Sequence, residues 1–298
     1  KSKETKKNGK RRAVQRYECL NCGKQFQSKR RRGRLRRAIW QDYVFGKQTI
    51  DQLAGQYQRS EKWIRGQLEK VSPNVYCRIP LQPITAVADI TFFGRSYGIL
   101  VFREPHLKKN LYFKEIVSET PLEYAEGRYS LEKQGFTFKA VTTDGKRGIR
   151  EVFKGIPTQM CHFHQIAIIN RYLTRRPKLE PAIELRRITL NLTKTNEETF
   201  TQQLVDWYTK YHPFLKEKTI NPVTGRWFYT HKRVRSAYRS LRTNLPYLFT
   251  YQRYPELDIP NTTNSLEGYF SNLKTLLRVH RGLTKKRRFK VIQEILNN

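Results

Sequence analysis

The sequence predicts an α/β fold in which a mixed sheet is flanked by helices and interrupted by a long helical insertion. Three strand-like runs, at 84–93, 97–102 and 111–117, follow one another directly. Helical and strand-like segments then alternate as far as residue 173, and helical spacing dominates from 178 to about 242. Consecutive strands followed by alternating elements favour a sheet with both antiparallel and parallel neighbours.

The composition indicates a basic protein that binds a polyanion. The chain has 298 residues, with 59 Lys or Arg against 25 Asp or Glu, which gives a formal charge of +34. Such a surface attracts nucleic acid or an anionic membrane and argues against small neutral substrates. No run approaches the roughly 18 apolar residues of a spanning helix, and four cysteines in this length do not make a disulfide scaffold. We therefore expect a soluble protein of a reducing cytoplasm.

The first 34 residues form a basic arm that contains a pair of cysteines. Residues 1–37 hold 16 Lys or Arg against two acidic residues, a run that is suited to contacts with phosphates. Cys19 and Cys22 lie in a Cys-x-x-Cys knuckle, followed by Gly23 and an aromatic residue, which is similar to the second half of a zinc ribbon. Zinc needs four ligands, so we expect a partial Zn²⁺ site that an upstream pair of ligands completes. A chance pair or a redox pair is the alternative.

Residues 35–71 show apolar positions at helical spacing, interrupted at Gly46 and around Gln58. This pattern predicts a helix-turn-helix, with Thr49 capping the middle helix and Ser60 the last one. The alternative is a three-helix module that only packs against its neighbour. The DNA-contacting residues expected on the exposed face of the last helix are Lys62, Arg65 and Gln67.

Prolines at 73, 80 and 83 indicate a linker between this segment and the sheet domain. The predicted boundaries are 1–34 for the arm, 35–71 for the helix-turn-helix, 72–83 for the linker, 84–177 for the first part of the core, 178–260 for the helical insertion, and 261–298 for the last core helix with a basic tail.

Asp89 is the only charged residue in the run 86–93. An unpaired buried carboxylate is costly, so Asp89 must be paired, protonated or bound to a cation, unless it faces water from an edge strand. Asp144 ends the fourth strand-like run, although Asp-Gly is also a common turn dipeptide. If the first and fourth strands are neighbours, both carboxylates meet at one end of the sheet, where a divalent cation relieves their repulsion.

Glu267 lies in the opening turn of a predicted helix over 265–279. Two interpretations fit its position equally well. Asn264 and Glu267 have the spacing of a capping box, in which the carboxylate only returns a bond to the cap amide. A carboxylate in a first turn can also point toward a metal at the edge of the sheet.

The order of these motifs resembles the DDE transposases, and specifically the bacterial Mutator-type insertion-sequence transposases whose variants begin with a zinc ribbon. The likeness spans nearly the whole chain. It is carried by Ala88-Asp89, Thr143-Asp144-Gly145, Cys161-His162-Phe163-His164, the helical insertion, and Asn264-Ser265-Leu266-Glu267-Gly268.

The resemblance implies a ribonuclease-H-like core whose catalytic triad maps onto Asp89, Asp144 and Glu267. This triad is expected to hold two Mg²⁺ or Mn²⁺ ions, which support DNA cleavage at element ends and strand transfer into target DNA. It further implies double-stranded DNA as partner, a homo-oligomer, no membrane association, and a bacterial cytoplasmic location at the nucleoid. The family's C-x-x-H signature is matched by Cys161 and His164, expected to be accessory residues, or else a buried Cys and a satisfied His.

A basic cluster near the end of the chain is also expected to contact DNA. Aromatic residues of the insertion, such as Trp207 and Trp227, are expected either along the DNA path or in the core. Two other functions remain open: a non-catalytic, sequence-specific DNA-binding protein derived from a transposase, and a ribonuclease-H-like nuclease that cuts without joining. The residues of the basic cluster are Arg281, Lys285, Lys286, Arg287 and Arg288.

Overall fold

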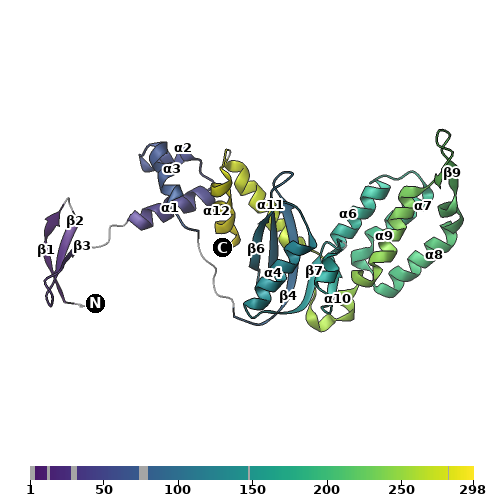
Figure 1. Cartoon of the computed structure of the whole chain (residues 1–298), viewed down its shortest axis with the longest axis horizontal. Helices are drawn as coiled ribbons and strands as arrows, with labels where there is room; N and C mark the ends of the chain where they lie inside the picture. The colour runs from purple at the N-terminus through teal and green to yellow at the C-terminus, as the bar shows by residue number, and fades with distance from the viewer. Residues whose placement is uncertain (1–3, 12–13, 28–31, 74–79, 147, 281) are drawn as a thin grey trace. The chain divides into compact units, whose positions relative to one another are not determined.

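The computed structural model describes residues 4–11, 14–27, 32–73, 80–146, 148–280 and 282–298 (Figure 1). The chain forms two compact units. Unit 1 combines Lys1–Tyr76 with Leu273–Asn298, and unit 2 is Cys77–Asn272. None of the helices in the described ranges is long and apolar enough to cross a membrane.

Unit 1 opens with a small antiparallel sheet of three strands, β1 (Thr5–Arg11), β2 (Val14–Cys19) and β3 (Gln25–Gln27). The central strand β2 pairs with both neighbours. Tyr17 of β2 stacks on Phe26 of β3 with ring centroids 5.9 Å apart. This aromatic pair lies across the two strands that flank the Cys-x-x-Cys turn.

Three helices follow in unit 1: α1 (Arg32–Val44), α2 (Ile50–Tyr57) and α3 (Glu61–Glu69). The predicted caps are confirmed. Thr49 accepts a hydrogen bond from the backbone of Gln52 and completes a capping box, and Ser60 accepts one from the backbone of Trp63. The apolar residues buried between the helices are Ile39, Trp40, Leu53, Ile64 and Leu68.

The C-terminal helix α12 (Lys285–Leu296) belongs to unit 1 and packs against α1. Glu294, almost fully buried, forms an ion pair with Arg37 of α1. Arg287 pairs with Glu69 of α3. The sequence groups residues 273–298 with the last core helix, whereas the structure places them with the N-terminal helices.

Unit 2 is built on a mixed five-stranded sheet, as the sequence predicts. The strand order is β6-β5-β4-β7-β8, with β4 antiparallel to β5, β5 antiparallel to β6, and β4, β7 and β8 parallel. The first and fourth strands of the core are therefore neighbours. The strands are β4 (Pro83–Phe92), β5 (Gly98–Glu104), β6 (Lys109–Ile116), β7 (Thr137–Thr143) and β8 (Thr158–Met160).

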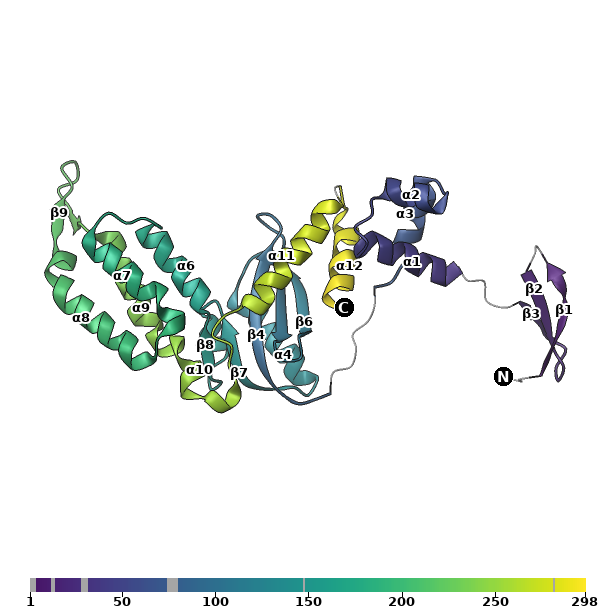
Figure 2. The same ribbon diagram turned by 180° about the vertical axis from the view of Figure 1, so that it is seen from behind.

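Helices cover both faces of this sheet (Figures 1 and 2). On one face, α4 (Pro121–Lys133) and α5 (Ile149–Val152) enclose an apolar cluster around Phe102. On the other, the first turns of α11 (Asn264–Val279) lie across the strands, with the guanidinium of Arg103 5.1 Å from the ring of Tyr269. Alternation along β4 directs Asp89 to the same face as Arg103, because Val87 pairs with Arg103.

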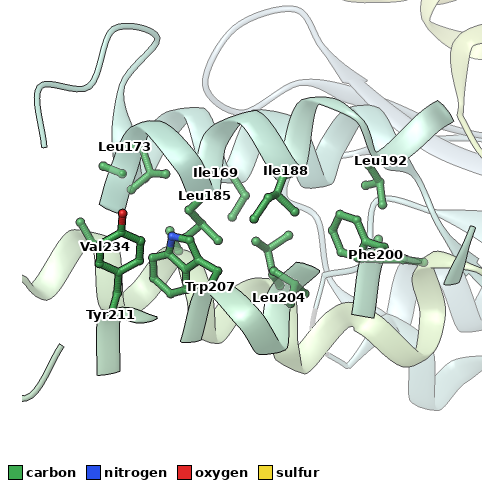
Figure 3. Close-up of a cluster of buried hydrophobic side chains, with 14 of the residues drawn as sticks. Ile169, Leu173, Leu185, Ile188, Leu192, Phe200, Leu204, Trp207, Tyr211 and Val234 are labelled. Carbon is green, nitrogen blue, oxygen red and sulfur yellow. The ribbon is translucent and has the colours of Figure 1, made fainter. Parts of the chain in front are cut away.

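A helical module follows β8, with α6 (His162–Leu173), α7 (Glu180–Leu190), α8 (Glu197–Lys216) and α9 (Lys232–Leu248). These helices enclose the apolar cluster shown in Figure 3, in which Trp207 is buried. Trp207 is therefore a core residue. Shorter helices complete the module: η1 (Leu192–Lys194), α10 (Thr250–Arg253) and η2 (Pro255–Leu257).

The prediction of an all-helical insertion was wrong, because β9 (Lys218–Ile220) and β10 (Trp227–Tyr229) form an antiparallel hairpin between α8 and α9. Its turn is built by Asn221, whose side chain accepts hydrogen bonds from the next backbone amides, and by Gly225 at φ +65°. The ammonium of Lys218 lies 4.0 Å from the ring of Trp227. Turn chemistry here overrides the helical periodicity on either side.

Candidate carboxylate site and its neighbouring cluster

Asp89 lies near the end of β4, the central strand of the sheet, and is 7% exposed. The interpretation of Asp89 as a water-facing residue on an edge strand is therefore wrong. Its Oδ1 accepts a hydrogen bond of 2.8 Å from the backbone amide of Ile90. This bond holds the carboxyl group in place but leaves its other oxygen available.

Asp144 follows β7 directly, beside Asp89. The parallel register pairs Val87 with Thr142, and Asp89 and Asp144 each come two residues later on their strands. Asp144 is half-buried, and its Oδ1 accepts a 3.0 Å bond from the amide of Lys146. It therefore shapes the turn after β7 and also places a carboxylate at the same end of the sheet as Asp89.

Glu267 lies in the first turn of α11 and is half-buried. The helix begins at Asn264, so the capping box predicted between Asn264 and Glu267 is wrong in its position. Thr263, the residue before the helix, accepts the Glu267 amide on its carbonyl at 3.0 Å, and its hydroxyl donates to Glu267 Oε1 at 3.3 Å. Thr263 is fully buried, and sequence reasoning missed it, although Thr before a helix is a common cap signal.

Three hydrogen bonds tie the segment that leads into α11 to the rest of unit 2. Thr85 of β4 donates to the carbonyl of Leu257 at 3.0 Å, and Thr142 of β7 donates to that of Pro260 at 2.7 Å. The first amide of α6, from His162, donates to the carbonyl of Asn261 at 2.9 Å. These bonds position the start of α11 beside β4, β7 and α6.

The electrostatics of Asp89 reflect the convergence of the three carboxylates. Burial raises the pKa of Asp89 to about 7, and the negative charges of Asp144 and Glu267 also raise it. The charge of His164 and the amide of Ile90 act in the opposite direction and lower this pKa. Asp89 thus interacts electrostatically with both other members of the predicted triad.

Cys161 and His164 adjoin the same carboxylates. The strand β8 ends at residue 160, and Cys161 lies between it and α6. The amide of Cys161 donates to the carbonyl of Thr143 at 2.8 Å, and that of His162 donates to the carbonyl of Asn261 at 2.9 Å. Burial alone lowers the pKa of His164, but the interaction with Cys161 and the negative charges of Asp89 and Asp144 outweigh this effect and raise the pKa to about 9.

Candidate ligand atoms of Cys161, His164 and Glu267 all lie within 4.8 Å of one another. Among the residues that the structure describes, this is the one group of three or more His, Cys, Asp or Glu that meets this distance. Asp89, Asp144 and Glu267 interact through their charges but do not form so tight a group. The structure thus places Glu267 in a mixed cluster that the sequence did not predict.

Some of the residues predicted to contact DNA are exposed, and others are half-buried in contacts with neighbouring side chains. Lys62, Lys285 and Lys286 are exposed, and so is Arg65, which pairs with Glu61 one turn away at 2.7 Å.

Two of these predicted residues are not on an open face. Gln67 is half-buried and accepts a 3.3 Å bond from Arg36, and Arg287 is held by Glu69, so neither lies as expected. Arg288 is half-buried, and Arg281 lies outside the described residues.

Cys19 ends β2 and Cys22 lies in the turn that follows. The turn is closed by bonds from the Cys19 amide to the carbonyl of Lys24 at 3.1 Å and from the Gly23 amide to the carbonyl of Cys19 at 2.9 Å. In the described part of unit 1 these two cysteines belong to no group of three or more candidate ligands. The zinc ribbon stays a prediction.

Comparison with known proteins adds no family to these observations. No family model matches the chain, and the search of curated proteins finds no match. The functional interpretation therefore depends on the sequence motifs and on the geometry of unit 2.

Proposed function

We propose that this chain is a metal-dependent DNA transposase of the DDE type, with a ribonuclease-H-like core. The observation that carries the proposal is the convergence of Asp89, Asp144 and Glu267. Asp89 lies near the end of β4, and Asp144 follows the adjacent parallel strand β7 in matching register. Glu267, in the first turn of α11, raises the pKa of Asp89 together with Asp144. The mixed five-stranded sheet is compatible with such a core.

The three carboxylates fit hard divalent cations. A carboxyl group as buried as Asp89, with two further carboxylates near it, is costly to ionise unless a cation compensates the charge. Carboxylate oxygens are the ligands that Mg²⁺ and Mn²⁺ prefer. Bound there, such ions would activate the nucleophile and stabilise the leaving 3′ oxygen of a phosphodiester.

The residues of the chain contribute orientation and DNA binding. The amide of Ile90 fixes the Asp89 carboxyl, and the hydroxyl of Thr263 fixes that of Glu267. Exposed cations such as Lys62 and Lys285 contact phosphates, in line with the +34 charge of the chain. No covalent intermediate with the protein is needed, because the freed 3′-hydroxyl attacks the target strand directly.

A strand-joining assay tests the proposal. The purified chain is mixed with labelled DNA from either side of its coding sequence and with a supercoiled target, in the presence of Mg²⁺ or of a chelator. We expect metal-dependent cleavage and joining by the wild type and by Asp206→Asn, an exposed carboxylate of the same unit that serves as control. We expect Asp89→Asn to bind the DNA but to cleave none.

The other outcomes contradict the proposal in distinct ways. Cleavage without joining indicates a nuclease, and binding without either reaction indicates a non-catalytic DNA-binding protein. Retained cleavage in Asp89→Asn removes Asp89 from the active site.

A further inference from the structure

The cluster of Cys161, His164 and Glu267 is chemically different from the carboxylate site beside it. It offers a sulfur, an imidazole nitrogen and a carboxylate oxygen within 4.8 Å of one another. Cys161 is fully buried, and the other two residues are half-buried. Soft sulfur and nitrogen ligands are those that Zn²⁺ takes, whereas Mg²⁺ avoids them.

The local fold explains why these three residues meet. Cys161 precedes α6 and His164 lies in its first turn, so the two are three positions apart and share one face of the helix. The bond from the His162 amide to the carbonyl of Asn261 holds the entry to α11 against this turn. Glu267, in the first turn of α11, therefore lies beside the sulfur and the imidazole.

Thr263 links the sulfur to the carboxylate. Its backbone amide donates to the Sγ of Cys161 at 3.3 Å, and its hydroxyl oxygen lies 3.4 Å from the same sulfur. The same hydroxyl donates to Glu267 Oε1 at 3.3 Å. Second-sphere bonds of this kind orient metal ligands before the metal binds, and an amide donor also stabilises a sulfur anion.

The imidazole of His164 supplies an independent observation. Its Nδ1 is buried, and no hydrogen-bond partner for it occurs among the described residues. A buried ring nitrogen without a partner is unfavourable and needs an explanation, such as an ion that is bound in the working protein.

We propose that Cys161, His164 and Glu267 bind one Zn²⁺ ion and that Glu267 is shared between this site and the carboxylate site. Three protein ligands leave a fourth position open to water, the arrangement of an exchangeable zinc site. On binding, the Cys161 thiol and the protonated ring of His164 each release one proton to solvent, and the sulfur anion and the freed ring nitrogen coordinate the metal. A consequence follows that rests on the proposed function: Zn²⁺ withdraws Glu267 from Asp89 and Asp144 and inhibits cleavage.

Cobalt is the probe for the site, because Co²⁺ bound to sulfur gives a charge-transfer absorption in the near ultraviolet. The test uses the full chain with Cys19→Ser and Cys22→Ser, which removes the sulfurs of the knuckle in unit 1. We expect the band to saturate at one Co²⁺ per chain and to disappear when Zn²⁺ is added. Absence of the band in this background overturns the proposal.

Variants then assign the ligands. We expect Cys161→Ser in this background to lose the band and Asp89→Asn to keep it, because Asp89 is not one of the three ligands. Glu267→Gln keeps the sulfur and is expected to weaken Co²⁺ binding about tenfold or more. Unchanged affinity in Glu267→Gln excludes Glu267 from the site, and this result decides the matter even where Cys161→Ser fails to fold.

The inhibitory consequence is measured as the ratio of the cleavage rates with and without Zn²⁺, at constant Mg²⁺. We expect this ratio to fall well below one in the background protein and to return toward one in Cys161→Ser. A cobalt band with no inhibition by Zn²⁺ overturns the shared role of Glu267. A cobalt band in a chain that cleaves no DNA contradicts the proposed function but supports the zinc site.

Discussion

Replacing Asp89 by Asn is expected to stabilise the metal-free protein, although it abolishes the proposed activity. Burial raises the pKa of Asp89 from its usual 3.8 to about 7, so the fold disfavours the ionised form. The sign follows from linkage: the cost of ionisation begins as the pH rises above the unfolded value of 3.8 and is complete above the folded value of about 7. Asn carries no charge and avoids this cost.

The pKa difference sets the size of the effect. Between 3.8 and about 7, it corresponds to a cost of about 4 kcal/mol near pH 8 and of about 2 kcal/mol near pH 5, where folding is penalised only in part. The Oδ1 of Asn still accepts the amide of Ile90, so the hydrogen bond is kept. The advantage of Asp89→Asn in unfolding free energy should therefore grow by about 2 to 3 kcal/mol between these pH values.

Urea unfolding with a chelator present, followed by tryptophan fluorescence and circular dichroism, measures this difference. Asp206→Asn is the control, because Asp206 is an exposed carboxylate of unit 2. Millimolar Mg²⁺ should reduce the difference in unfolding free energy between Asp89→Asn and the wild type, since a bound cation compensates the buried charge of Asp89. A difference in unfolding free energy that is the same near pH 5 and near pH 8 refutes the reasoning from burial.

Three further predictions concern unit 1. Glu294→Ala leaves Arg37 without its buried partner and should cost about 3 kcal/mol of unfolding free energy, measured by chemical denaturation. Burial lowers the pKa of His280, so protonation favours the unfolded state; stability should fall as the pH drops below about 6.5, and less so in His280→Gln, as thermal melts at several pH values will show. The double replacement of Lys285 and Lys286 by Ala should weaken binding to any DNA sequence and reduce the slope of log affinity against log salt by about two, measured by fluorescence anisotropy.

Local pattern predicted the strands of the sheet and the place of both aspartates. The run that contains Asp89 is apolar on both faces of the sheet, which is typical of a central strand, and the structure places it there. The order of strand-like segments allowed the strands of Asp89 and Asp144 to be neighbours but did not require it, and the register shows that they are. Both signals are contained in short stretches of sequence.

Features that depend on distant contacts were not predictable from local pattern. The pattern of residues 158–163 does not reveal where the strand ends and α6 begins, and the backbone bonds at this junction are made to the distant residues Thr143 and Asn261. Glu294 is almost fully buried and forms an ion pair with Arg37, which is far away in the sequence, so local pattern does not indicate its burial. Arg287, near the end of the chain, likewise forms an ion pair with a residue of a distant helix, Glu69 of α3.

The position of Glu267 connects two unsatisfied groups that the sequence shows only separately. Asp89 is a buried carboxyl whose ionisation is unfavourable, and His164 carries a buried nitrogen to which none of the described residues hydrogen-bonds. Under the two proposals, a hard cation would relieve the first group and a soft cation the second, and either one would take Glu267 as a ligand. Since one carboxylate adjoins both groups, these proposals imply that the identity of the metal at Glu267 determines which of the two groups is satisfied.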